Sequence, residues 1–142
     1  MPDKLFIDTW GWIVLFNKRE PRHKEADAFY RSFRLQGGEI YTSDYVLDET
    51  FTLLFKRVPG KAASEALRLI NSACHEGFVE LVWVLPQLFE KTKQFRLKLQ
   101  DKPGISFTDL TSMLIMKEHG ISSILTDDEH FLQVGMGYKL LL

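Results

Sequence analysis

The sequence predicts an α/β fold in which helices cover both faces of a mostly parallel sheet. Short apolar segments alternate with amphipathic helical segments, and no internal repeat or Ser/Gly-rich linker interrupts this alternation. Strands separated by helices are joined by right-handed crossovers, which make neighbouring strands parallel. The chain has 142 residues, the length of one ordinary domain with a single core, so we expect residues 1–142 to form one domain.

Composition narrows the class of protein without naming a function. Hydrophobic residues make up 45% of the chain and charged residues 26%, as in soluble globular proteins. No apolar run is long enough to span a membrane. Cys74 is the only cysteine, so no internal disulfide forms and a reducing cytoplasm is expected, with Cys74 in the core. The net charge of −1 neither indicates nor excludes binding to nucleic acid.

The first half of the chain contains two short strand patterns and three helical ones. The apolar run that ends at Ile7 is typical of a buried strand. Pro21 is expected to open a helix, and Gly37 and Gly38 to end it. Ser43 offers an N-cap for the following helix. The expected strands are residues 4–7 and 40–42, and the expected helices are residues 9–16, 21–36 and 44–57.

The second half repeats the alternation of strands and helices. Pro59 and Gly60 break the chain before a helix, and Pro86 starts another. A turn is expected at residues 101–104, after which Ser106 or Thr108 caps a helix that ends near Gly120. The expected strands are residues 79–84, 124–126 and 138–141, and the expected helices are residues 61–75, 86–99 and 106–120.

Acidic residues fall where the carboxyl ends of these strands are expected. Asp8 ends the first strand, Glu49 follows the second, Asp109 opens the helix before the fourth, and residues 127–129 (Asp-Asp-Glu) follow the fourth. In an open parallel sheet, ligands bind beside this edge. Two of these residues have simpler explanations: Asp8 would cap the helix that begins at Thr9, and Asp109 would complement a helix N-terminus.

Glu49 is harder to explain as a surface charge. Residues 46, 49, 50 and 53 share one face of a helix that is apolar on most sides. We therefore expect Glu49 to be at least half-buried, where an ionised carboxylate needs a cation partner. Asp48 is expected to lie at the surface.

Converging carboxylates without a fixed basic partner suit Mg²⁺ or Mn²⁺, which prefer oxygen ligands. Two like charges 4 Å apart repel by about 4 kcal/mol at an effective dielectric constant near 20, so a cation is needed to hold such a group together. A metal with phosphate oxygens in its coordination sphere indicates phosphodiester hydrolysis.

Four segments together resemble the PIN-domain nucleases, especially the VapC-like toxins of toxin–antitoxin pairs. They occur in family order and cover nearly the whole chain: FIDTWGWIVLFN with PRHKEA downstream, TSDYVLDETFTLLFKR, SFTDLTSMLIMKEHGI and LTDDEHFLQVGMGY. The resemblance implies a three-layer α/β/α sandwich, an Mg²⁺ or Mn²⁺ site and cleavage of RNA. It also implies a homodimer and a small antitoxin that inserts a segment into the acidic groove.

By motif, the resemblance assigns the metal-binding and catalytic quartet to Asp8, Glu49, Asp109 and Asp128. It leaves Asp127 at a variable position, as a residue that contacts the metal through water, and leaves Glu129 in solvent. The residues expected to hold waters or carboxylates through their hydroxyl groups are Thr9, Ser43 and Thr126.

The resemblance also bears on the roles of His130 and Trp10. His130 is expected to pack or hydrogen-bond rather than to act as a general base. Trp10 departs from the family, which usually has a small residue there; it would fill a core or dimer gap, or stack an RNA base.

Two other functions compete with a metal-dependent ribonuclease. One is a PIN-like RNA-binding module with weak or no catalysis, against which the presence of all four acids argues. The other is a phosphatase or receiver domain with a phosphorylated aspartate. A dehalogenase-type phosphatase needs a second aspartate two residues after Asp8, where this chain has Trp10, and a receiver needs its paired acids near the first strand.

Overall fold

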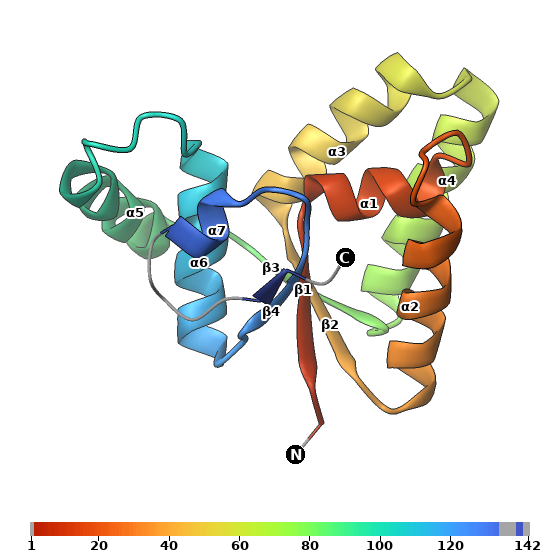
Figure 1. Ribbon diagram of the computed structural model, residues 1–142, viewed down its shortest axis with the longest axis horizontal. Helices are drawn as coiled ribbons and strands as arrows, with labels where there is room; N and C mark the ends of the chain where they lie inside the picture. Colours follow the sequence, from red (N-terminus) through yellow and green to blue (C-terminus); the bar gives the residue numbers. More distant parts are fainter. Residues whose placement is uncertain (1, 134–138, 141–142) are drawn as a thin grey trace.

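The computed structural model describes residues 2–133 and 139–140, and its centre is a parallel sheet (Figure 1). Its strands lie in the order β3-β2-β1-β4-β5, and every neighbouring pair is parallel. The strands are β1 (Lys4–Ile7), β2 (Glu39–Ser43), β3 (Val79–Val82), β4 (Ser123–Leu125) and β5 (Lys139–Leu140). Tyr138 and Leu141, expected in the last strand, lie outside the described residues.

Helices cover both faces of the sheet. Figure 1 shows α1, α2 and α4 on one side and α5, α6 and α7 on the other, which confirms the predicted α/β/α sandwich. α3 lies beyond the carboxyl ends of the strands and contacts both α1 and α6. The helices are α1 (Thr9–Phe16), α2 (His23–Leu35), α3 (Asp44–Arg57), α4 (Gly60–His75), α5 (Pro86–Lys98), α6 (Phe107–His119) and α7 (His130–Gln133).

Most described element boundaries lie within one residue of the prediction, and two differ by two residues because local hydrogen bonds replace the regular pattern. α2 begins at His23 rather than Pro21, because the backbone N–H of His23 donates to the carbonyl of Glu20 (3.0 Å) and closes a turn. β3 ends at Val82 rather than Val84, because the Val84 N–H donates to the carboxylate of Asp44 (2.7 Å).

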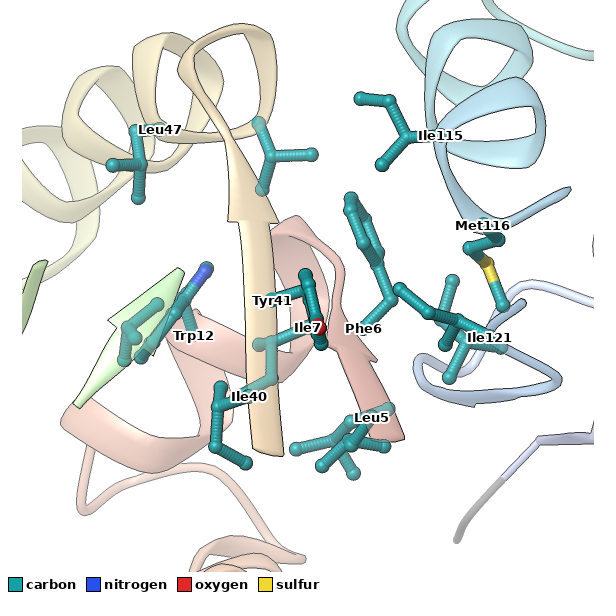
Figure 2. Close-up of a cluster of buried hydrophobic side chains, with 14 of the residues drawn as sticks. Leu5, Phe6, Ile7, Trp12, Ile40, Tyr41, Leu47, Ile115, Met116 and Ile121 are labelled. Atoms are coloured by element: carbon teal, nitrogen blue, oxygen red, sulfur yellow. The ribbon is translucent and has the colours of Figure 1, made fainter. Parts of the chain in front are cut away.

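The core is built on β1, whose Leu5, Phe6 and Ile7 have no exposed surface. Burial on both faces explains why β1 is continuously apolar rather than alternating. Figure 2 shows Phe6 directed toward Ile115 of α6, and Met116 of the same helix belongs to the same buried cluster. These contacts fix β1, and with it Asp8 at its carboxyl end.

Two linked, buried hydrogen bonds also fix the end of β1. The indole Nε1 of Trp12 donates to Thr42 Oγ1 (3.0 Å), and that hydroxyl donates to the carbonyl of Ile7 (3.1 Å). Breaking a hydrogen bond between buried groups leaves a donor or acceptor without a partner, which costs stability. These two bonds therefore hold α1, β2 and β1 together at the residue before Asp8.

Three expectations from composition can be compared with the structure. Cys74 is half-buried and packs against the core, as predicted. Trp10 is half-buried and also packs against the core. No helix among the described residues is both long and apolar enough to cross a membrane.

Candidate active site

Asp8 lies at the carboxyl end of β1 with only 6% of its surface exposed. It occupies the N-cap position of α1, but its side chain makes no capping hydrogen bond. Burial, and then the nearby charge of Asp109, raise the pKa of Asp8 from 3.8 to about 7. A carboxyl group this strongly perturbed and not used to cap its helix is typical of a functional site.

Thr126 links Asp8 to the segment after β4. Its fully buried hydroxyl donates to Asp8 Oδ2 (2.9 Å) and accepts from the backbone N–H of Asp128 (3.1 Å). One side chain therefore sets the position of one carboxylate and of the backbone that carries another. The sequence predicted that the hydroxyl of Thr126 would hold a carboxylate, and the structure has this contact.

Asp109 both caps α6 and belongs to the acidic cluster. It forms a capping box with Ser106: the Asp109 N–H donates to Ser106 Oγ (3.0 Å), and Asp109 Oδ2 accepts from the Ser106 N–H (3.2 Å). Burial, and then the charge of Asp128, raise the pKa of Asp109 even though the bonds from Ser106 lower it. The capping role and the site role therefore coexist in one side chain.

Asp128 lies beside Asp109 and His130. The backbone N–H of His130 donates to Asp128 Oδ1 (2.9 Å), and the imidazole Nδ1 of His130 lies 3.0 Å from the same oxygen. One ligand atom from each of Asp109, Asp128 and His130 lies within 4.8 Å of the other two. The sequence interpretation treated His130 as a packing or hydrogen-bonding residue and missed it as a third possible ligand, although its position two residues after Asp128 was a signal.

Glu49 is exposed, so the prediction that it is at least half-buried was wrong. The buried face of α3 is defined by Val46, Thr50 and Leu54, each with no exposed surface, and Glu49 lies beside this face rather than on it. Its charge nevertheless raises the pKa of both Asp8 and Asp109. The charge of Glu49 therefore acts on the acidic cluster, although the side chain itself is exposed to solvent. Asp48 is exposed, as predicted.

The remaining predicted residues lie around the cluster in different ways. Thr9 Oγ1 is buried and has no hydrogen-bond partner. Ser43 is buried and accepts from the Val46 N–H (3.1 Å), so its hydroxyl caps α3. Asp127 is exposed, as is Glu129, which was predicted to face solvent.

The donor set fits a hard divalent cation. Within the described part of the chain, no lysine or arginine forms an ion pair with Asp8, Glu49 or Asp109. No basic side chain therefore relieves the mutual repulsion of these carboxylates, which adds to the effect of burial in raising the pKa values of Asp8 and Asp109. Carboxylate oxygens, with one imidazole nearby, are ligands that Mn²⁺ and Mg²⁺ accept.

Comparison with known proteins identifies the family. The PIN domain family model matches residues 5–136. The chain belongs to the PIN domain family. This PIN domain is also homologous to the 23S rRNA-specific endonuclease VapC20 of Mycobacterium tuberculosis, with 30% identity over 131 residues that cover 92% of this chain and 94% of the relative.

Solved structures agree with this assignment. The crystal structure of M. tuberculosis VapC20, described as a sarcin-ricin loop cleaving toxin, matches with a TM-score of 0.76 over 92% of this chain and 95% of that one. VapBC2 from Rickettsia felis, bound to a DNA fragment from its promoter, matches with a TM-score of 0.70 at 18% identity, over 97% of both chains. The second likeness shows that the two PIN domains share a fold.

Proposed function

We propose that this protein is an Mg²⁺- or Mn²⁺-dependent endoribonuclease, with Asp8, Glu49, Asp109 and Asp128 as the catalytic, metal-binding quartet. The observation that carries the proposal is the meeting of buried Asp8, half-buried Asp109 and Asp128 at one edge of the sheet, where the charge of Asp109 raises the pKa of Asp8 and the charge of Asp128 raises that of Asp109. Homology to an RNA endonuclease supports it.

Each residue of the site has a different role in the proposed hydrolysis, according to its environment. When bound, the cation lowers the pKa of an attacking water and stabilises charge on the phosphate oxygens. Asp8 and Asp109 would hold the cation as carboxylates, while Thr126 holds Asp8 and the backbone of Asp128 in place. Thr9 Oγ1, which is buried without a partner, and exposed Asp127 would orient water around the site.

We propose structured RNA as the substrate class. The 30% identity to a 23S rRNA-specific endonuclease makes 23S rRNA the first substrate to test. We further propose that the protein is a single domain over residues 1–142, acts in the cytoplasm as a homodimer, and is the toxin of a toxin–antitoxin pair. A small neighbouring gene for a DNA-binding antitoxin that suppresses growth arrest on co-expression is expected; arrest that no neighbouring gene relieves would contradict the toxin role.

The decisive assay is cleavage of 23S rRNA and of a labelled RNA hairpin in Mg²⁺ or in EDTA. Cleavage is expected only with metal, and Asp8→Asn and Asp109→Asn variants that remain folded are expected to lose it. Cleavage that persists in EDTA would overturn the mechanism. RNA that binds tightly but stays intact in either metal would favour the alternative, an RNA-binding PIN module with weak or no catalysis.

A further inference from the structure

The loop at residues 99–105, between α5 and α6, adjoins residues that hold two members of the acidic cluster. At its end, Ile105 precedes Ser106 and the capping box that holds Asp109. One residue earlier, Gly104 faces His130, because a side-chain Cβ at Gly104 would lie 3.4 Å from His130 Nε2. His130 in turn contacts Asp128. A shift of this loop therefore moves the supports of two carboxylates at once.

Arg96, in the last turn of α5, holds this loop from within. Its guanidinium donates to three backbone carbonyls, those of Leu99, Lys102 (2.9 Å) and Ile105. The side chain is half-buried, and among the described residues it forms no ion pair with a carboxylate. Its donors therefore serve the loop alone.

These bonds exceed what is needed to end a helix. Basic side chains in a last turn often bond the final carbonyls of their own helix, and the bond to Leu99 is of this kind. The carbonyls of Lys102 and Ile105 belong to the loop, however, and the side chain of Ile105 is 1% exposed, in the core. The planar fork of arginine reaches three carbonyls at once, which the single ammonium of lysine does not reproduce.

We propose that Arg96 is a positioning residue for the metal site: by clamping the 99–105 loop, it fixes the place of Asp109 through Ser106 and of Asp128 through His130. It touches neither carboxylate itself. Groups that orient metal ligands in this indirect way typically change metal affinity or activity by about 10–100-fold when they are lost. The inference rests on the proposed function for its metal-binding and catalytic readouts, whereas the amide signals are independent of it.

The test compares Arg96→Met, which keeps the apolar stem but no donors, with Arg96→Lys, which keeps the charge but not the fork. Arg68→Met is the matched control, since Arg68 lies on a helix surface, is 67% exposed and pairs with Glu65. Two amides report position directly: that of Asp109, which donates to Ser106, and that of His130, which donates to Asp128. Their NMR signals are measured without metal, followed by Mn²⁺ titration and then by kcat and KM for RNA cleavage.

We expect both amide signals to shift in Arg96→Met and in Arg96→Lys. Neither signal is expected to shift in Arg68→Met. The Mn²⁺ dissociation constant is expected to rise about tenfold or more, and kcat to fall more than KM changes. A role limited to helix stability would lower Tm while leaving the amide signals and Mn²⁺ affinity unchanged below Tm, and that result would overturn the inference. If Arg96→Met does not fold, Arg96→Lys decides by the same criteria.

Failure of the proposed function is distinguishable from failure of this inference. Wild-type protein that binds Mn²⁺ but leaves RNA intact would contradict ribonuclease activity, while the two amides and the Mn²⁺ affinity would still decide the role of Arg96. If the wild-type protein cleaves RNA and the Arg96 variants match it in amide signals, Mn²⁺ affinity and cleavage, the inference about Arg96 is wrong. The proposed function would still stand.

Discussion

Replacing Asp8 with asparagine should stabilise the metal-free protein at alkaline pH. The Asp8 carboxyl has a pKa of about 7 in the folded protein against 3.8 as the ordinary value, because it is buried next to Asp109. A group with a raised pKa binds its proton more tightly when folded, so the protein loses stability as pH rises from about 4 to about 7. The full change corresponds to about 4 kcal/mol, of which about 2.5 kcal/mol falls between pH 5 and pH 8.

The assay is urea unfolding of wild type and Asp8→Asn in EDTA at pH 5 and pH 8. Asparagine has nearly the same shape and can still accept the bond from Thr126, so the comparison isolates the charge. The stability advantage of the variant should grow by about 2.5 kcal/mol between the two pH values. Parallel changes in both proteins would refute the reasoning, because they would show that Asp8 titrates as an ordinary exposed carboxyl group.

Added metal should remove most of the stability advantage of Asp8→Asn at pH 8. A ligand that binds only the folded state stabilises it by about 2.7 kcal/mol at 100 times its dissociation constant. Wild type should therefore gain stability with Mn²⁺ while Asp8→Asn, which lacks one ligand, gains little. Equal gains in both proteins would show that Mn²⁺ binds elsewhere on the chain.

Three further experiments with substitutions separate the roles of neighbouring residues. Asp128→Asn should lower cleavage and Mn²⁺ affinity by about 100-fold or more, whereas Glu129→Gln, at an exposed position, should change either by less than about twofold; the reverse order in RNA cleavage assays would overturn the assignment. Thr126→Val should destabilise the protein by about 2 kcal/mol in urea unfolding and Thr126→Ser by less, since only serine keeps the hydroxyl that bonds Asp8; equal losses would argue that the methyl group matters instead. Ser106→Ala should cost about 1 kcal/mol by removing the cap of α6, and thermal melts that show no loss would contradict the capping box.

The sequence predicted that Asp8, Asp109 and Asp128 would lie near one another because the alternation of strands and helices is a strong constraint. Once strands and helices alternate, the carboxyl ends of parallel strands meet at one edge, so Asp8 and the segment after β4 are brought together without knowledge of side-chain detail. Ser43 and Ser106 were predictable as caps for a different reason, since capping depends only on local spacing.

The errors and omissions arise where tertiary contacts decide the outcome. Helical spacing groups residues on a face but does not say which face meets the core, so Glu49 was expected inside and is exposed. β3 is shortened by the side chain of Asp44, 40 residues before its partner Val84. Arg96 carried no signal at all, because its partners are backbone carbonyls, which look alike in every sequence.

The central claim is that carboxylates at the sheet edge hold one or more divalent cations. Anomalous diffraction from crystals soaked in Mn²⁺ tests it most directly. The account predicts a manganese peak within coordination distance of Asp8, Asp109 and Asp128, and its loss in Asp109→Asn crystals. Crystals of active protein whose only manganese peaks lie away from these three carboxylates would contradict it.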